Sequence, residues 1–256
     1  MTPFFATHTF WAAGKLTKIE RICLGSLVKN GHNLIVWSYE DLQNLPAGAT
    51  PGDAREILPE SSFFALPNGS CAPFSDYFRY TVLNTAGGLW VDTDVIALRP
   101  TSALNWETPF LVTERLPTPF VSGLVKRVLK KKNSIRVNNN VIFNPKPEIG
   151  NIIDMAQCYS QRFPKNKVTW SQLGPDLLSA IEQIYPGHGF DIKPPDYANS
   201  VDYWRCPLEF FKSGRKPNRA AAFLHLYGQT WAEAKLEKNG SFPRGSMMKT
   251  FEDEYL

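Results

Sequence analysis

The stretch SDYFRYTVLNTAGGLWVDTDV, Ser75 to Val95, decides the fold expected for this 256-residue chain. Its first half predicts a helix that the glycine pair at 87–88 ends, and LWV then predicts a short buried strand with DTD at its carboxyl end. Ligands of open α/β sheets bind beyond such strand ends. The carboxylates of Asp92 and Asp94 point the same way on an extended chain, which suits Mg²⁺ or Mn²⁺ with bound phosphates. The alternative is a polar surface turn.

The chain on either side of this stretch predicts strands and helices in an α/β order. The opening order strand, helix, strand is typical of an α/β fold with a parallel sheet. We therefore expect one α/β domain with a helical addition in its second half. Strands are expected at 3–11, 32–38, 89–91, 95–98, 109–114 and 134–143, and helices at 16–31, 73–88, 148–163 and 174–185.

Composition excludes several classes of protein. Hydrophobic residues make up 43% and charged residues 20% of the chain, which is typical of a globular protein and not of a disordered one. The formal charge of +4 is too mild to indicate nucleic acid as a partner. The four cysteines are scattered without zinc-site spacing, which favours a reducing compartment.

The sequence predicts a cytoplasmic protein, with contact at the inner membrane face as an added hypothesis. The first residues do not resemble a signal peptide, and no apolar run approaches the ~20 residues that span a bilayer. The basic run KRVLKKK is either a solvated face or a contact with an anionic membrane surface. The residues proposed for that contact are Lys126, Arg127, Lys130, Lys131 and Lys132.

Asp76 and Arg79 precede the DTD on the predicted helix. Their i, i+3 spacing places both side chains on one face, within pairing distance. They form either a surface ion pair of little energetic value or a pair that holds the hydroxyls and phosphates of a sugar nucleotide.

Together these residues resemble the signature of the DXD-containing glycosyltransferases, D-x-x-R…L…GG-x-Y-x-D-x-D. That group includes glycosyltransferase family 32, the α-1,4-galactosyltransferases, the yeast outer-chain mannosyltransferase and the clostridial glucosylating toxins. Trp90 stands where the group mostly has tyrosine. The resemblance implies a GT-A fold with a Rossmann-like mixed sheet and flanking helices. It also implies one domain over 1–256, with a nucleotide-sugar half at 1–100 and an acceptor half at 101–256.

Three further stretches resemble the same family. HTFW resembles its H-x-x-W, which implies that Trp11 stacks on the donor uracil, unless it is a core tryptophan. HLYGQTW resembles its C-terminal segment, which implies His225 as a metal ligand and Trp231 at the diphosphate, although a single histidine is more often structural. The run VNNNVIF implies that Asn140, or else Asn139, lies near the donor sugar; a polar strand end is the alternative.

The implied reaction is metal-dependent transfer of a sugar, with retained anomeric configuration, from a nucleotide donor to a hydroxyl. The donor implied is a UDP-sugar, and the acceptor is a glycan or lipid-linked glycan of bacterial surface polysaccharide synthesis. Asp94, with Asp92, would hold Mn²⁺ or Mg²⁺ at the departing diphosphate. Arg79 would assist at the phosphates, and Asp76 would orient sugar hydroxyls.

Two other functions remain open from the sequence. One is a non-catalytic module that binds a sugar nucleotide. The other is a phosphatase of the haloacid dehalogenase type, whose motif needs Thr or Val where Ile96 stands and normally lies near the N-terminus.

Overall fold

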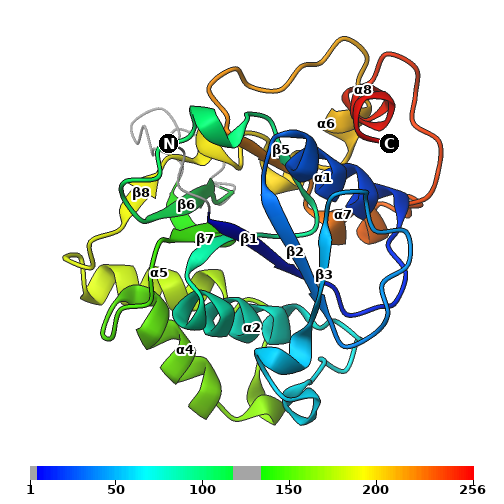
Figure 1. Cartoon of the computed structure of the whole chain (residues 1–256). Helices are drawn as coiled ribbons and strands as arrows, with labels where there is room; N and C mark the ends of the chain where they lie inside the picture. Colours follow the sequence, from blue (N-terminus) through cyan, green and yellow to red (C-terminus); the bar gives the residue numbers. More distant parts are fainter. Residues whose placement is uncertain (1–4, 118–133) are drawn as a thin grey trace, which may run out of the picture.

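The computed structural model of this chain describes residues 5–117 and 134–256. It shows a central sheet with helices on both sides (Figure 1). The basic side chains predicted to touch a membrane, Lys126 to Lys132, lie outside the described residues, and that contact stays a prediction.

The described residues form one seven-stranded sheet with the order β3-β2-β1-β4-β7-β6-β8. β1, β2, β3 and β4 run parallel, whereas β7 is antiparallel to both β4 and β6. A two-stranded sheet of β5 and β9 lies beside it. The strands are β1 (Ala6–Phe10), β2 (Asn33–Ser38), β3 (Thr50–Asp53), β4 (Gly88–Val91), β5 (Val95–Ala97), β6 (Phe110–Arg115), β7 (Ile135–Asn144), β8 (Asp191–Lys193) and β9 (Phe223–His225).

Helices cover both faces of this sheet (Figure 1). On one face α2, α4 and α5 pack side by side, and on the other α1 packs against β5 and α8. The helices are α1 (Lys18–Lys29), α2 (Ala72–Thr85), α4 (Ile152–Arg162), α5 (Pro175–Ile184), α6 (Leu208–Phe211), α7 (Gly228–Glu233) and α8 (Met247–Tyr255). The expected mixed α/β sheet with flanking helices and a helical addition is confirmed.

The glycine pair between α2 and β4 fixes how the central strand enters the sheet. Both glycines have positive φ angles, +68° at Gly87 and +100° at Gly88, which other residues rarely adopt. A Cβ atom on Gly88 would lie 2.5 Å from the backbone oxygen of Ala6 on β1. Glycine is therefore required for β4 to pack beside β1, and that packing carries Asp92 and Asp94 to the carboxyl edge of the sheet.

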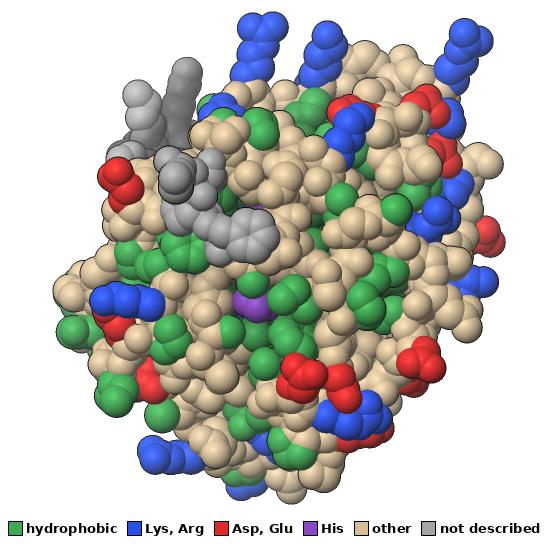
Figure 2. Space-filling model, viewed as in Figure 1, with side chains coloured by type: hydrophobic (Ala, Val, Ile, Leu, Met, Phe, Trp, Pro, Cys, Tyr) green, Lys and Arg blue, Asp and Glu red, His purple; other side chains and the backbone are tan. Residues whose placement is uncertain are grey.

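The predicted strands and helices are present, and their boundaries shift by a few residues. Short elements were missed: β3, β8, β9, α6, α7 and α8. Most of them contain three to six residues, too few to show a hydrophobic period. None of the described helices is long and apolar enough to cross a membrane. Basic and acidic side chains are interspersed on the face in Figure 2, consistent with the mild net charge.

Candidate active site

The DTD sequence forms the turn between β4 and β5. The backbone N–H of Val95 donates to the carbonyl of Asp92 at 3.1 Å, an ordinary hydrogen-bond length, and this bond closes the turn. The N–H of Asp92 donates to the Asn140 carbonyl on β7 at 2.9 Å. These two bonds fix the backbone of Asp92 at the edge of the sheet.

Arg79 is buried behind this turn and pairs with two carboxylates. Its Nη2 lies 3.0 Å from Asp92 Oδ1 and 3.2 Å from Asp76 Oδ1. Its guanidinium also lies 5.0 Å from the ring centroid of Trp90, whose indole Nε1 donates to Asp92 Oδ1 at 2.7 Å. Asp76 and Arg79 are 5% and 3% exposed, so the alternative of a surface ion pair is excluded.

Burial shifts the protonation of these acids. It raises the pKa of Asp76 to about 6, although Arg79 and the amide of Asn139 oppose the shift. Burial also raises the pKa of Asp92, against the attraction of Arg79 and with a further contribution from Asp94. Arg79 is the group that most strongly favours the charged form of both acids.

His225 reaches the DTD turn through the pairing of β5 with β9. The two strands are antiparallel with Val95 opposite His225, and the Leu226 N–H donates to the Asp94 carbonyl at 2.9 Å. This register places His225 Nε2 3.4 Å from Asp94 Oδ2. The Gly228 N–H at the start of α7 donates to the same oxygen at 2.6 Å.

The resulting cluster could hold a divalent metal ion. One ligand atom from each of Asp92, Asp94 and His225 lies within 4.8 Å of the others. Two carboxylates with one imidazole suit Mn²⁺ better than Mg²⁺, which prefers oxygen ligands throughout. Burial would raise the pKa of Asp94, but His225, the Gly228 N–H and Lys238 together hold it below its ordinary value. Asp94 is therefore charged and ready to bind a cation at neutral pH.

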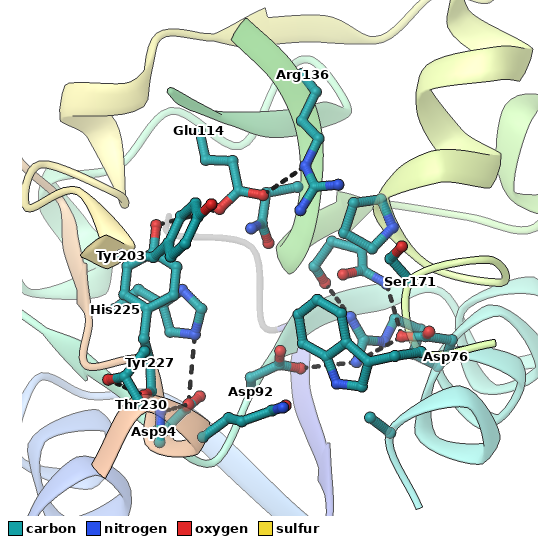
Figure 3. A pocket seen from close by; sticks show the side chains of 18 of the residues that line it. Asp76, Asp92, Asp94, Glu114, Arg136, Ser171, Tyr203, His225, Tyr227 and Thr230 are labelled. Carbon is teal, nitrogen blue, oxygen red and sulfur yellow. Dashed lines mark hydrogen bonds and ion pairs between the residues drawn. The ribbon is translucent and has the colours of Figure 1, made fainter. Parts of the chain in front are cut away.

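A cavity of about 470 Å³ opens on one side of this cluster (Figure 3). Asp76, Arg79 and Asn139 line one wall, and Glu114 and Arg136 from β6 and β7 line another. Glu114 is buried; its Oε1 accepts from Arg136 Nε at 2.7 Å, and Oε2 lies 3.3 Å from the Tyr227 hydroxyl. Other lining residues include Trp170, Ser171, Pro175, Tyr203 and Thr230.

A second cavity, of about 410 Å³, lies on the other side of the cluster. The end of β1 contributes Thr9 to Ala13, including Trp11, and the loop before α2 contributes residues 69–72. Both cavities share Ala72, Arg79, Asp92, Asp94, Gly228 and Gln229. The DTD turn therefore stands at the junction of two adjoining cavities.

The predicted site residues fall into two groups in the structure. Six of them line a cavity: Trp11, Asp76, Arg79, Asp92, Asp94 and His225. Asn140 and Trp231 line neither of the two. Trp231 is fully buried against Phe211 and Phe242, and its Nε1 donates to the Leu226 carbonyl at 3.0 Å. The structure thus places Trp231 in the core rather than at the diphosphate end of the turn.

Asn140 turns away from the cavity because β7 is irregular at this point. Leu111 on β6 pairs with Ile142, but its neighbour Val112 pairs with Asn138, so residues 139–141 of β7 have no partner on β6. Such bulges redirect side chains. Asn138 and Asn139 line the first cavity, and Asn139 Nδ2 donates to Asp76 Oδ1 at 2.8 Å.

Several lining residues had no signal in the sequence. Lys238 lines the second cavity, where its Nζ pairs with Glu20 Oε1 at 2.6 Å and lies 5.9 Å from the ring centroid of Trp11. Glu114, Arg136 and Tyr227 line the first. Glu114, Arg136 and Lys238 are isolated residues outside any motif, and Tyr227 lies in HLYGQTW but was not singled out there. Tertiary packing brings all four to the DTD turn.

Comparison with known families agrees with this geometry. Residues 34–111 match the family described as glycosyltransferase sugar-binding region containing DXD motif. This part of the chain carries the sugar-binding region of a DXD glycosyltransferase. The match covers the DTD turn, α2 and β4, and it favours a glycosyltransferase over the phosphatase. The family implies a sugar donor and an acceptor for the enzyme.

Two solved glycosyltransferase structures are similar to this chain. The PaToxG glycosyltransferase is 19% identical, with a TM-score of 0.45 over 71% of this chain and 70% of its own. The apo-form glycosyltransferase GlyE of Streptococcus pneumoniae TIGR4 is 15% identical, with a TM-score of 0.47 over 98% of this chain and 60% of its own. No curated protein matches the chain in sequence.

Proposed function

We propose that this chain is a glycosyltransferase that moves a sugar from a UDP-sugar to a hydroxyl of a glycan, with retention at the anomeric carbon. The observation that carries the proposal is the Asp92–Asp94–His225 cluster at the junction of two cavities. A nucleotide sugar has the matching shape, because its diphosphate joins an aromatic base to a sugar. The nucleoside would occupy the cavity at Trp11, and the sugar would occupy the cavity at Asp76.

The cations around the junction support a diphosphate there. Arg79 lines both cavities, and Lys238 lines the cavity at Trp11. Trp11 presents a half-buried ring to that same cavity, where an aromatic base could stack on it. Asp92, Asp94 and His225 would hold Mn²⁺, which would supply positive charge to the leaving diphosphate. Of the two halves expected from the sequence, residues 1–100 would form most of the nucleotide end of the site. Residues 101–256 would add Gln229 and Lys238 to it.

The sugar end of the site contains groups that can bind hydroxyls. Asp76 Oδ1 is occupied by Arg79 and Asn139, and its Oδ2 is left to accept from a sugar hydroxyl. Glu114 is held by Arg136 and Tyr227. Because Asp76 and Glu114 are engaged in this way, we propose same-face attack by the acceptor rather than a covalent intermediate. The bond from the anomeric carbon to the phosphate oxygen breaks with its electron pair. The acceptor oxygen bonds to the same face, and its proton passes to the leaving phosphate.

The rim of the first cavity supports a glycan as the acceptor. Trp170 is 46% exposed there, and Tyr203 lies on the same cavity wall as Tyr227. Exposed aromatic rings at a polar cavity suit the apolar faces of sugar rings. Gly174 and Pro175 carry the start of α5 to this rim. Synthesis of a bacterial surface polysaccharide would provide such an acceptor.

The proposal is tested with a panel of nucleotide sugars and Mn²⁺. We expect a UDP-sugar to raise the melting temperature by mass action only when Mn²⁺ is present, and to be hydrolysed slowly to UDP and free sugar. Asp94→Asn should abolish the hydrolysis while the fold is kept. Asp253→Asn, which alters an exposed carboxylate of α8, is the matched control and should behave as the unmodified enzyme. Normal turnover by Asp94→Asn would refute the assignment. Release of inorganic phosphate from a monoester would instead support the phosphatase.

A further inference from the structure

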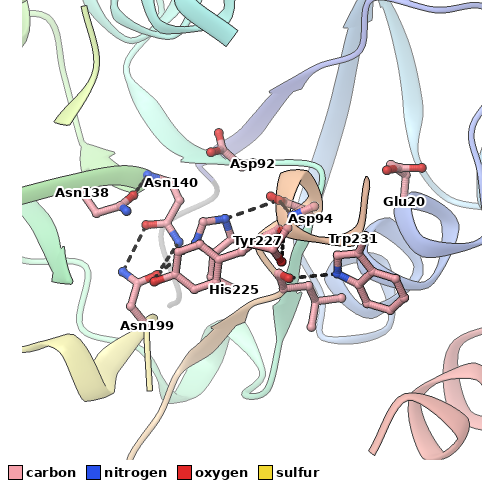
Figure 4. A network of polar contacts seen from close by, with 12 residues as sticks. Glu20, Asp92, Asp94, Asn138, Asn140, Asn199, His225, Tyr227 and Trp231 are labelled. Atoms are coloured by element: carbon pink, nitrogen blue, oxygen red, sulfur yellow. Dashed lines mark hydrogen bonds and ion pairs between the residues drawn. The ribbon is translucent and has the colours of Figure 1, made fainter. Parts of the chain in front are cut away.

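Asn199 occupies a buried position behind the metal-binding cluster, on the side of His225 that faces away from Asp94 (Figure 4). It follows the short helical turn Pro195–Tyr197, and its N–H donates to the Pro195 carbonyl at 2.7 Å. The neighbouring Ala198 carbonyl accepts from the His225 N–H at 2.9 Å. The backbone of this segment is therefore fixed to β9 beside the histidine.

The orientation of the Asn199 amide is determined by a backbone carbonyl. Its Nδ2 donates to the Thr113 carbonyl at 3.0 Å. A carbonyl oxygen only accepts hydrogen bonds, so a flipped amide would bring two oxygens together there. Asn140 supports the same orientation, because its Nδ2 donates to Asn199 Oδ1 at 3.1 Å. Asn199 Oδ1 must therefore point toward His225.

This orientation determines which nitrogen of His225 carries a proton. His225 Nδ1 lies 3.1 Å from Asn199 Oδ1, and an amide oxygen cannot donate. Nδ1 must therefore be the protonated nitrogen. Nε2 is the atom that faces the Asp94 carboxylate (Figure 4). When no metal is bound, a proton on Nε2 is attracted to Asp94. Because Nδ1 keeps its proton through Asn199, the Nε2 proton is the one that an incoming metal ion displaces.

Tyr227 does not disturb this arrangement. Its hydroxyl lies 3.2 Å from Asn199 Oδ1 and 3.3 Å from Glu114 Oε2, and it has one proton to donate. A charged carboxylate is the stronger acceptor, so the proton goes to Glu114. Its ring packs on His225 with the ring centroids 3.8 Å apart, which fixes the plane of the imidazole.

We propose that Asn199 is a positioning residue that holds His225 in the Nδ1–H tautomer, so that Nε2 is presented to a divalent metal ion. The inference rests on the proposed function, in which His225 is a metal ligand. It assigns to Asn140 a role different from the one expected from the sequence. Asn140, on β7, donates a hydrogen bond to Asn199 instead of facing the donor sugar. Partners of this kind, behind a ligand histidine, orient the ring and increase its basicity.

The proton on Nδ1 can be detected by long-range ¹H–¹⁵N correlation of the imidazole nitrogens, first without metal and then with Zn²⁺. With four histidines in the chain, His225 can be assigned from a His225→Gln variant. We expect a protonated Nδ1 in the unmodified protein in both samples, and we expect Zn²⁺ to replace the proton on Nε2. Asn199→Ala should populate the Nε2–H form. Asn199→Asp keeps an acceptor and should restore the Nδ1–H form.

Zn²⁺ serves as a diamagnetic probe of the metal site, since it accepts both imidazole and carboxylate ligands. Asn199→Ala should weaken Zn²⁺ binding by about 10- to 100-fold, and Asn199→Asp should recover most of the loss. Ser200→Ala is the matched control, because the buried Ser200 hydroxyl has no hydrogen-bond partner among the described residues. It should change neither the tautomer nor the affinity.

The possible failures are distinguishable. An Nε2–H tautomer in the unmodified protein, or the same tautomer in Asn199→Ala and the parent, would overturn the role of Asn199. If instead the unmodified protein shows the Nδ1–H tautomer but binds neither Zn²⁺ nor Mn²⁺, the positioning is correct and the proposed metal-dependent function fails. Asn199→Asp also serves if Asn199→Ala does not fold: loss of the Nδ1–H form in that variant would count against the inference.

Discussion

Trp90 donates a hydrogen bond from its indole Nε1 to Asp92 Oδ1 at 2.7 Å, from a position on β4 that is almost fully buried. The same ring lies beneath the guanidinium of Arg79, which pairs with Asp92. The family signature mostly has tyrosine at the position of Trp90. The structure shows that tryptophan at this position still provides a polar hydrogen directed at the DTD turn.

Trp90→Phe should therefore weaken both the fold and the site. The change removes a hydrogen bond to a charged group and leaves a small cavity, so we expect a loss of about 2 to 4 kcal/mol in the free energy of unfolding. Urea denaturation measures this loss, and Mn²⁺ titration should show weaker binding. Trp106→Phe removes an indole bond to the Thr101 carbonyl, away from the site, and should leave Mn²⁺ binding unchanged. Equal effects of the two variants on Mn²⁺ binding would contradict a specific role for Trp90.

Asp76 should give the enzyme a pH-dependent stability. Burial raises its pKa to about 6 in the folded state, above the unfolded value of 3.8. Between about pH 4 and pH 6 the folded protein binds more protons at Asp76 than the unfolded chain does, so this residue's contribution to stability falls as pH rises. The full effect is about 2 to 3 kcal/mol.

Asp76→Asn cannot titrate and should lack this contribution. The measurement is the difference between the unfolding free energies of Asp76→Asn and the parent, from urea titrations at about pH 4 and pH 7, on either side of the window. We expect the variant to gain stability relative to the parent as pH rises. Transfer by the parent should increase through pH 6, since the ionised acid is the form that accepts from a sugar hydroxyl. A pH-independent difference in stability would show that Asp76 has an ordinary pKa.

Gly174 allows the start of α5 to approach Asp76. A Cβ atom there would lie 2.7 Å from Asp76 Oδ2 and 2.8 Å from Asn139 Nδ2. Gly174→Ala should cost about 1 to 3 kcal/mol of stability and lower transfer, because both side chains are part of the sugar end of the site. Gly187→Ala is the control, since nothing lies within 4 Å of a Cβ atom at that position. If both variants retain full stability and transfer, the close approach of α5 is not required.

Lys238 should contribute to binding of the diphosphate. Its pKa is raised because Glu20 and Asp94 outweigh the effect of burial, so it is charged at the second cavity. Lys238→Met keeps most of the side-chain volume and should weaken UDP binding by about tenfold, or about 1.4 kcal/mol. Calorimetric titration with UDP and Mn²⁺ measures the change.

Loss of Lys238 also leaves Glu20 buried without its cation, which could reduce stability on its own. The double variant Glu20→Gln with Lys238→Met removes that complication and should show the same loss of UDP affinity. Lys235→Met, at an exposed lysine nearby, is the control. If the double variant binds UDP as tightly as the parent does, Lys238 does not contribute to UDP binding.

The sequence by itself determined the local part of this enzyme. The helical spacing of Asp76 and Arg79, the glycine pair and the DTD at a strand end all depend on residues within a single short stretch. Backbone geometry over such a distance follows from residue type, as the positive φ angles of Gly87 and Gly88 illustrate. The α/β class and most of the longer helices and strands were predictable for the same reason.

Only the tertiary structure decided what surrounds that stretch. His225 lies beside Asp94 because β9 pairs with β5 in one register, and Asn140 faces Asn199 because β7 bulges opposite Leu111 and Val112. A strand register that differed by one residue would exchange the faces of these side chains. Such pairings join segments that are distant in the sequence, and their register depends on packing that no local pattern records. The DTD turn could therefore be located from sequence, whereas the residues that complete its metal site and its two cavities required the fold.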